Sequence, residues 1–361
     1  MMSGRKQIAL LGVFFVICML LLTACTGGVQ GEKDSTDHDT VMTITETDLP
    51  ASEPELQIKT FKLGFSTDES DPRAVAALEF KRIVEEESEG NIEIELYPNG
   101  SLGADKDLIM GVINGSVDMT VSSAGNFANF ANVGISAFPF LFQNFEEAWE
   151  FMDSPLLAEI NEELKEYNIH VLAHFDNGFR CITTSEKAGP IDSLADMKDL
   201  SIRTSNNQIV METMTTLGAK PKVLDFTLLY DALKNREFEA QENPIPVIYN
   251  HKLFEVQKYL AVTNHSYDAM PFVIREDLWN SLTSAQQDII EKAALKVQEL
   301  NRELNREQTE AYKELLEEEG MIFTYPDLEA FKTASRAVYD YFAPSYGEVL
   351  MDKVYELLDE K

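Results

Sequence analysis

The chain has 361 residues, with 62 acidic and 30 basic side chains and a formal net charge of −32 at pH 7. Proteins that bind the nucleic-acid backbone need clusters of lysine and arginine, so this charge argues against a DNA or RNA partner. Hydrophobic residues make up 44% of the chain and charged residues 25%, which is typical of globular proteins and does not suggest wholesale disorder. The length suggests roughly two domains.

The N-terminal residues have the pattern of a bacterial lipoprotein signal peptide. Arg5 and Lys6 form a short positive segment, and residues 8–22 then carry no charge. This apolar segment is shorter than the roughly 20 residues of a membrane span but suits a signal-peptide core. It ends at Leu22-Thr23-Ala24-Cys25, which resembles a lipobox. We therefore predict a signal peptide at 1–24 and a lipidated Cys25 that anchors the protein to the outer face of the cell membrane; an ordinary signal peptide with a chance cysteine is the alternative.

The cysteines and the following segment fit this prediction. Cys18 would leave with the signal peptide and Cys25 would carry lipid, so Cys181 has no partner for an internal disulfide. Residues 26–57 are rich in Thr, Ser, Asp, Glu and Gly and contain few large apolar side chains. Such a composition buries too little surface to offset the entropy of ordering. We interpret residues 25–57 as the lipidated cysteine and an acidic flexible tether, although a disordered tail without a role has the same composition.

From about residue 58 to 361 the sequence alternates between strand and helix patterns. Asp71-Pro72 is a strong helix start, and Ile92, Ile94 and Leu96 alternate with acidic residues as in a half-buried strand. Strands are expected at 62–66, 91–97, 117–122, 169–175 and 201–204, and further helices at 105–114, 146–167, 207–217, 227–236 and 246–260. This alternation predicts an α/β fold with mostly parallel sheets.

One predicted helix is much longer than the others. Thr283-Ser284-Ala285-Gln286 resembles a capping box, and apolar residues continue at helical spacing as far as Gly320. The helix could form a coiled-coil dimer, or it could be a strut that lies across two domains. Because the apolar positions do not form sustained heptads, we favour the strut and a monomer.

Signatures of catalysis and of metal binding are absent from the sequence. It contains no G-x-S-x-G elbow, no glycine-rich phosphate loop, no H-E-x-x-H motif and no cysteine cluster. His170 and His174 flank a predicted strand and could face the same side, but they lack further ligands nearby. We expect no metal, no cofactor and no enzymatic activity.

Several short motifs occur in a characteristic order. Each alone is a weak signal, whereas the ordered set is specific: Tyr97-Pro98, Ser101-Leu102-Gly103, Gly115-Ser116-Val117-Asp118, Phe138-Pro139-Phe140-Leu141-Phe142, Asn177-Gly178-Phe179-Arg180, Ser201-Ile202-Arg203, Gln241-Glu242-Asn243-Pro244 and Thr263-Asn264-His265. From about Lys62 to the C-terminus the chain resembles the extracytoplasmic solute-binding subunit of tripartite ATP-independent periplasmic (TRAP) transporters, the DctP-type family.

The resemblance implies a fold and a function. The fold would be a two-domain, periplasmic-binding-protein-like hinged clamp of type II, with the ligand in the interdomain cleft and the long helix spanning both domains. Domain I would comprise 58–180 and 269–308, and domain II 181–268 and 309–361. The ligand would be a small organic anion, which the receptor delivers to the membrane permease subunits of the transporter.

The resemblance also implies site residues. Arg203 matches the arginine that grips the ligand carboxylate, a role that suits a planar guanidinium because it can donate two parallel hydrogen bonds. Arg180 matches a second arginine of the cleft, and Asn243 the polar residue of the Gln-Glu-Asn-Pro turn. Phe226 would pack against the carbon skeleton of the ligand or in the core. The other candidate ligand-binding residues are Asn206, Ser66, Asp105, Ser123 and Tyr267.

The chain departs from the family pattern at three positions. Ala240 replaces a usual Gly, Ser205 a frequent Pro, and Leu228 a common acidic residue. These departures suggest a pocket of different shape, although the motifs around Arg180 and Asn264 are similar to those of members that bind sugar acids. Two alternatives stay open: a secreted lipoprotein enzyme acting on an anionic substrate, and the binding protein of an ATP-driven importer.

Overall fold

The computed structural model describes residues 58–130 and 132–359. The predicted signal peptide, the lipidated Cys25 and the tether up to residue 57 lie outside the described residues and remain predictions. In the part that is described, no helix is both long enough and apolar enough to cross a lipid bilayer.

The strands of the described residues form one mixed sheet in the order β2-β1-β3-β8-β4-β7-β5-β6, with β9 paired to β8. Their bounds are β1 (Lys59–Gly64), β2 (Ile92–Tyr97), β3 (Met119–Val121), β4 (Ile169–Thr184), β5 (Ser201–Thr204), β6 (Lys220–Val223), β7 (Ala240–Pro244), β8 (Tyr259–Arg275) and β9 (Ile322–Thr324). The pairs at both ends of the sheet are parallel, as expected. The expectation of mostly parallel pairing is wrong at the centre, where β4 and β8, the longest strands, are antiparallel.

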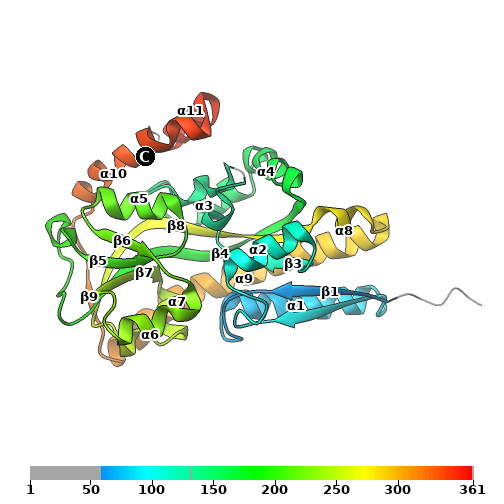
Figure 1. Ribbon diagram of the computed structural model, residues 1–361, viewed down its shortest axis with the longest axis horizontal. Helices are drawn as coiled ribbons and strands as arrows, with labels where there is room; N and C mark the ends of the chain where they lie inside the picture. The colour runs from blue at the N-terminus through cyan, green and yellow to red at the C-terminus, as the bar shows by residue number, and fades with distance from the viewer. Residues whose placement is uncertain (1–57, 131, 360–361) are drawn as a thin grey trace, which may run out of the picture. The chain divides into compact units, whose positions relative to one another are not determined.

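Two lobes share these central strands (Figure 1). The first lobe is built on β1, β2 and β3 with α1 (Pro72–Glu87) and α2 (Asp105–Asn114). The second is built on β5, β6 and β7 with α5 (Gln208–Thr216), α6 (Leu229–Lys234) and α7 (Ile245–Asn250). Strand β8 pairs with β3 of the first lobe, and β4 pairs with β7 of the second, so both central strands connect the lobes. The predicted domain boundaries stay a prediction, because the described residues pack as one compact unit.

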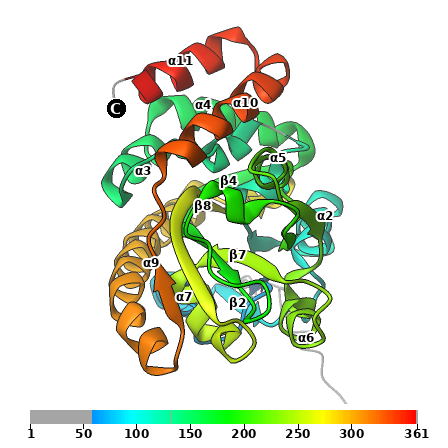
Figure 2. The same ribbon diagram turned by 90° about the vertical axis from the view of Figure 1, so that its left-hand side faces the viewer.

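The remaining helices cover the sheet and one end of the molecule. They are α3 (Phe145–Met152), α4 (Pro155–Glu162), α8 (Glu276–Asn280), α9 (Ser284–Glu318), α10 (Glu329–Tyr346) and α11 (Glu348–Asp359), with 3-10 turns η1 (Ala124–Phe127), η2 (Asn132–Ala137), η3 (Glu163–Tyr167), η4 (Leu194–Met197), η5 (Phe226–Leu228) and η6 (Leu253–Glu255). Helices α10 and α11 lie at the end formed by α3 and α4, and Val338, Tyr339 and Phe342 join the same hydrophobic core as side chains of those helices (Figure 2).

Local sequence explains where several elements begin. Asp71 caps α1 by accepting a hydrogen bond from the backbone N–H of Arg73 at 2.9 Å, and Pro72 is the first helical residue. The single helix expected at 146–167 is wrong, because Ser154 and Pro155 start a new helix. The helix expected at 246–260 is also wrong beyond Asn250, since Lys252 adopts a left-handed φ of 54° and β8 begins at Tyr259.

Helix α9 has the predicted capping box, formed by Thr283 and Gln286. It packs against α1 of the first lobe, against β4 and against α7 of the second lobe. Its middle buries polar side chains, of which Gln298 and Asn301 accept hydrogen bonds from the β4 N–H groups of His174 and Asp176. The helix is therefore a strut that is bonded to the central strand and packed against both lobes.

Asp176 lies fully buried at this contact and supports a prediction about pH. Burial raises its pKa to about 7. The hydrogen bond from Trp149 Nε1, at 3.1 Å, and the charge of Arg302 lower the pKa, but by less than burial raises it. The folded protein then holds a proton that the unfolded chain releases near pH 4, so the contribution of Asp176 to stability should fall as pH rises from 4 to 7, whereas buried His174, whose pKa is lowered to about 3, contributes in the opposite direction. We expect this loss to reach at most about 4 kcal/mol, at about 1.4 kcal/mol per pKa unit.

Urea denaturation across this pH range checks the prediction with two variants. Asp176→Asn should make stability rise more steeply, or fall less, with pH than in the wild type, because the amide does not titrate. Asp288→Asn, at an exposed position of α9, should keep the wild-type slope. An unchanged slope in Asp176→Asn would contradict the assignment.

Candidate ligand-binding site

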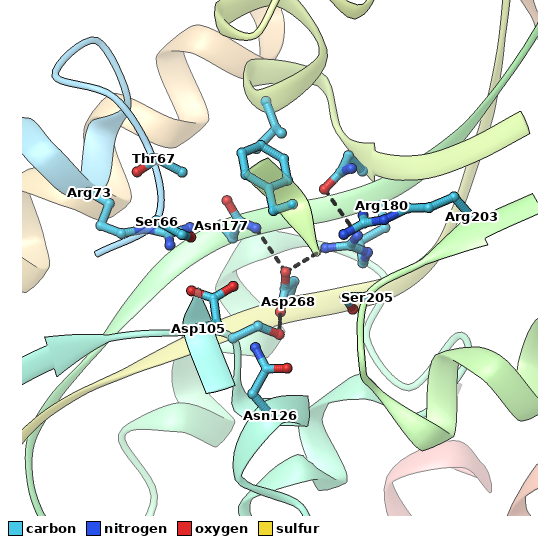
Figure 3. A pocket seen from close by; sticks show the side chains of 14 residues that line it. Ser66, Thr67, Arg73, Asp105, Asn126, Asn177, Arg180, Arg203, Ser205 and Asp268 are labelled. Carbon is cyan, nitrogen blue, oxygen red and sulfur yellow. Dashed lines mark hydrogen bonds and ion pairs between the residues drawn. The ribbon is translucent and has the colours of Figure 1, made fainter. Parts of the chain in front are cut away.

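A small cavity lies between the lobes and is partly open to solvent. Both lobes and both central strands contribute to its wall, which is mostly polar (Figure 3). The lining residues are Ser66, Thr67, Arg73, Asp105, Ser123 and Asn126 from the first lobe, Arg203, Ser205, Phe226, Asn243 and Val247 from the second, and Asn177, Arg180 and Asp268 from β4 and β8. A concave site with convergent polar groups is the usual form of a small-molecule site.

Most of the residues expected from the sequence meet in this cavity. Ser66, Asp105, Ser123, Arg180, Arg203, Phe226 and Asn243 all line it. Asn206 is exposed and lines an adjoining hollow that shares Arg203 and Asp105 with the main cavity. Tyr267 lines neither, because it is buried in the core against Phe142 and Phe179, whereas the next residue, Asp268, reaches the cavity.

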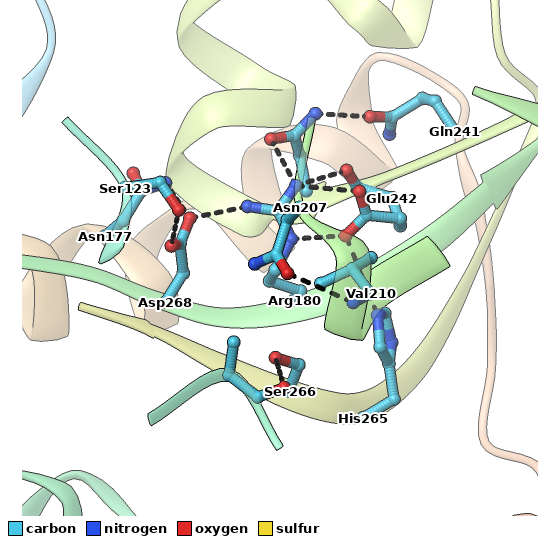
Figure 4. Close-up of polar contacts among 12 residues, drawn as sticks. Ser123, Asn177, Arg180, Asn207, Val210, Gln241, Glu242, His265, Ser266 and Asp268 are labelled. Carbon is cyan, nitrogen blue, oxygen red and sulfur yellow. Dashed lines mark hydrogen bonds and ion pairs between the residues drawn. The ribbon is translucent and has the colours of Figure 1, made fainter. Parts of the chain in front are cut away.

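Arg180 is held in a buried network of charges (Figure 4). Its Nε and Nη2 atoms donate hydrogen bonds to the carboxylate of Glu242, and its Nη1 atom donates to Asp268 Oδ2 at 2.6 Å. A further bond from Nη2 reaches Asn243 Oδ1 at 3.1 Å. Burial alone would raise the pKa of Glu242, but Arg180 lowers it to about 2, so the carboxylate stays ionised. Arg180 is therefore largely neutralised before any ligand arrives.

Arg203 has a different environment, although it is only 2% exposed. Its Nε and Nη2 atoms donate to the backbone oxygen of Leu224 at 2.9 and 2.6 Å. These bonds use two of the five donors of a guanidinium, and no carboxylate described in the structure forms an ion pair with it. Burial lowers the pKa of Arg203 to about 10, since the charge of Glu242 offsets only part of the desolvation. Arg203 is thus a buried cation without a counter-ion.

The carboxylates of the cavity supply hydrogen-bond acceptors. Asp268 accepts bonds from Asn177 Nδ2 at 2.8 Å and from Ser123 Oγ at 2.5 Å, in addition to Arg180. Asp105, the first residue of α2, accepts a bond from Ser122 Oγ at 3.1 Å. An entering anion therefore meets cations and acceptors on the same wall.

An irregularity in β4 brings Asn177 and Arg180 to the same cavity. Strict alternation along a strand would send residues three positions apart to opposite faces. The pairing of β4 with β8 shifts register between Asp176 and Gly178, so Asn177 is an extra residue in a β-bulge. The bulge lets Asn177 share the face of Arg180.

Sequence reasoning missed part of the cavity wall. The missed residues are Thr67, Arg73, Asn126, Asn177, Ser205, Val247 and Asp268. Asn177 and Ser205 belong to motifs that were recognised, and Asp268 is the neighbour of a residue that was chosen. Arg73 follows a clear helix start, but nothing in the local pattern distinguishes it from a surface arginine.

The two histidines considered as metal ligands have separate structural roles. His170 stacks on Trp279 with ring centroids 4.4 Å apart and contacts Glu276 through Nδ1 at 2.9 Å. His174 is buried, and burial together with the charge of Arg302 lowers its pKa to about 3. Among residues 58–130 and 132–359, no three His, Cys, Asp or Glu side chains converge as metal ligands would.

Comparison with known proteins identifies the family. The model of the bacterial extracellular solute-binding protein family 7, DctP, matches residues 63–345. The chain belongs to this family. It is 31% identical over 281 residues to the 2,3-diketo-L-gulonate-binding periplasmic protein YiaO of Escherichia coli (strain K12), with 77% of this chain and 85% of that protein covered.

Solved structures of family 7 proteins share the fold. The sugar acid binding protein DctPAm from Advenella mimigardefordensis, in complex with galactonate, superposes with a TM-score of 0.80 at 26% identity over 84% of this chain and 99% of that one. A TRAP periplasmic solute binding protein from Roseobacter denitrificans with bound L-galactonate gives a TM-score of 0.78 at 29% identity, covering 84% and 99%. These likenesses confirm the resemblance to TRAP receptors and the two-domain fold of type II.

Membership in family 7 indicates the general role of the protein. Proteins of this family are extracytoplasmic solute-binding proteins, and TRAP binding proteins bind small organic acids and work with membrane permease subunits. The relatives compared above are binding proteins. The buried cation Arg203 suits such a role, since it can pair with a ligand carboxylate.

The contrast between the two arginines generates a prediction about stability. Arg180→Met would leave Glu242 and Asp268 buried without their counter-ion, and we expect it to lower the free energy of unfolding by about 3–5 kcal/mol. Arg203→Met removes a cation that is costly to bury without a counter-ion, which offsets the loss of its bonds to the backbone oxygen of Leu224, so the unfolding free energy of the ligand-free protein should not fall by more than about 1 kcal/mol. Urea denaturation of both variants measures the difference; equal losses would contradict the division between a paired and an unpaired arginine.

Proposed function

We propose that this protein is the solute receptor of a TRAP transporter and that it captures a polyhydroxy monocarboxylate, such as an aldonate or a uronate. The observation that carries the proposal is the buried guanidinium of Arg203, which lines the interlobe cavity without a carboxylate partner. Leaving such a charge unpaired is costly, and a ligand carboxylate would offset that cost with two parallel hydrogen bonds.

The rest of the cavity supports a hydroxylated ligand. Asp105 and Asp268 are acceptors when ionised, so they suit ligand hydroxyl groups and would repel a second carboxylate. This argues for sugar acids over simple dicarboxylates. Relatives of known structure include proteins with bound galactonate, L-galactonate and L-gulonate, which supports this choice.

Closure of the lobes would complete the site. Gly125 in η1 of the first lobe lies directly against Asn207, the cap of α5 in the second lobe, and a Cβ at Gly125 would fall 1.8 Å from Asn207 Nδ2. We infer that the lobes are closed here and that they separate for ligand entry around β4 and β8. A ligand that contacts both lobes favours the closed population, which the permease subunits would then recognise.

No chemical conversion of the ligand is part of the proposal. None of the lining residues is a histidine or a cysteine, and Ser123 donates its hydroxyl hydrogen to Asp268. The wall therefore has no Ser–His or Cys–His pair, and the proposal assigns its carboxylates, Asp105 and Asp268, to hydrogen bonds with ligand hydroxyl groups. Recovery of the bound ligand unchanged after incubation with the protein separates a receptor from an enzyme.

Calorimetry against a panel of acids tests the function. We expect L-galactonate or L-gulonate to bind more tightly than succinate, because succinate would bring a second carboxylate to Asp105. Arg203→Ala should weaken binding of the preferred acid by 100-fold or more, on the order of 3 kcal/mol, as for loss of one partner of a desolvated charge pair.

The matched control is Arg82→Ala, since Arg82 is exposed on α1 and, within the part of the chain that the structure describes, forms ion pairs with Glu79 and Glu86 of the same helix. It should bind the acid with wild-type affinity. Near-native affinity in Arg203→Ala would contradict the role proposed for Arg203. Failure of the wild-type protein to bind any acid of the panel would contradict the proposed function.

We also propose that Cys25 carries a lipid that holds the receptor at the membrane. The support is the sequence Leu22-Thr23-Ala24-Cys25 at the end of the apolar segment. In bacterial cells that process lipoproteins, the wild-type protein should partition into the detergent phase of Triton X-114 extracts. Cys25→Ala should move it to the aqueous phase, while Cys181→Ala should leave its partitioning unchanged; equal partitioning of all three proteins would contradict lipidation.

A further inference from the structure

A third arginine, Arg73, faces the cavity from the first lobe. It lies in the first turn of α1, lines the cavity and is 5% exposed. In Figure 3 its side chain extends from α1 toward Ser66. Arg203 reaches the cavity from β5 in the second lobe, so the two guanidinium groups come from opposite lobes.

Arg73 has too few partners for a buried guanidinium. Its Nε atom is buried and makes no hydrogen bond. The Asp71 carboxylate is its ion-pair partner in the described residues, at 3.8 Å from Nε, which is too long for a hydrogen bond. The same Asp71 oxygen already accepts the bond that caps α1, and its other oxygen lies 3.9 Å from His251 Nε2.

The neighbourhood of Arg73 indicates what it would bind. A guanidinium only donates hydrogen bonds, and the carboxylate oxygens of Asp105 on the same wall accept them. A hydroxyl group can accept a bond from the first and donate one to the second. A carboxylate at this end of the ligand would instead face the charge of Asp105.

We propose that Arg73 is a specificity-determining residue that binds hydroxyl oxygens at the end of the ligand remote from its carboxylate. This inference rests on the proposed function, because Arg203 must hold the carboxylate. Arg73 then selects for chain length: an acid long enough to span from Arg203 to the first lobe gains the Arg73 hydrogen bonds, and a shorter acid does not.

Calorimetry with a stereochemically matched series of acids tests the proposal. L-Galactonate, D-arabinonate and D-threonate share the same configuration next to the carboxylate and lose one hydroxylated carbon at each step. The wild-type protein should lose affinity along the series, by 10-fold or more between the first and last members. Arg73→Met should bind L-galactonate at least 10-fold more weakly than the wild type and D-threonate with less than a 2-fold change, so the preference for length should disappear.

Further variants keep the test decisive. Arg73→Gln retains a donor and should keep part of the length preference, and it replaces Arg73→Met if that variant does not fold. Arg82→Ala, on the exposed face of the same helix, should keep the whole preference.

An equal loss of affinity for all three acids in Arg73→Met would overturn the proposal, because it would mean that Arg73 acts through folding or closure. Absence of any length preference in the wild type would also overturn it. Failure of the wild type to bind any of these acids, and any acid of the larger panel, would reject the proposed function instead.

Discussion

The buried ion network of Arg180, Glu242 and Asp268 is the interaction on which the site depends. Arg180 stands on β4, Glu242 on β7 and Asp268 on β8, so one guanidinium joins three neighbouring strands at the cavity. Burying an ion pair is expensive unless both charges and their remaining hydrogen-bonding groups are satisfied. Here Asn177 and Ser123 donate hydrogen bonds to Asp268, and Asn243 accepts one from Arg180. The network therefore makes a polar wall rigid in advance of ligand binding.

This pairing also gives the arginines of the cavity different roles. The charge of Arg180 is neutralised by carboxylates of the protein. Arg203 is instead a buried cation whose counter-ion would be a carboxylate of the ligand. The distinction matters in a chain with a net charge of −32, since the surface as a whole repels an anion. Salt screens that repulsion beyond about 8 Å, whereas a guanidinium inside the cavity acts at contact distance. Affinity for an acid can thus coexist with a strongly acidic surface.

The scaffold links the geometry of the cavity to the long helix. The bulge in β4 that brings Asn177 to the cavity interrupts the regular ladder, and α9 supplies side chains there: Asn301 accepts from the N–H of Asp176, and Asn305 donates to its carbonyl oxygen. Backbone groups that a bulge leaves without strand partners must be satisfied in some other way when they are buried. The polar residues in the middle of α9 meet that need, and they explain why this helix has no purely apolar stripe.

The sequence by itself determined the family, the capped long helix, the half-buried strand β2 and the identity of Arg203 as a cavity residue. Each of these follows from the spacing of residues close together in the sequence or from an ordered set of motifs, so no knowledge of distant contacts is needed. Tertiary structure alone decided which arginine is free, because the carboxylates that neutralise Arg180 stand 62 and 88 positions away in the chain. It also decided that Asp268 and not Tyr267 faces the cavity, since a shift of one residue along a strand reverses the face. The role of Arg73 also depends on the tertiary structure: a helix start can be read from neighbouring residues, but whether its arginine is buried and short of hydrogen-bond partners depends on what folds against it.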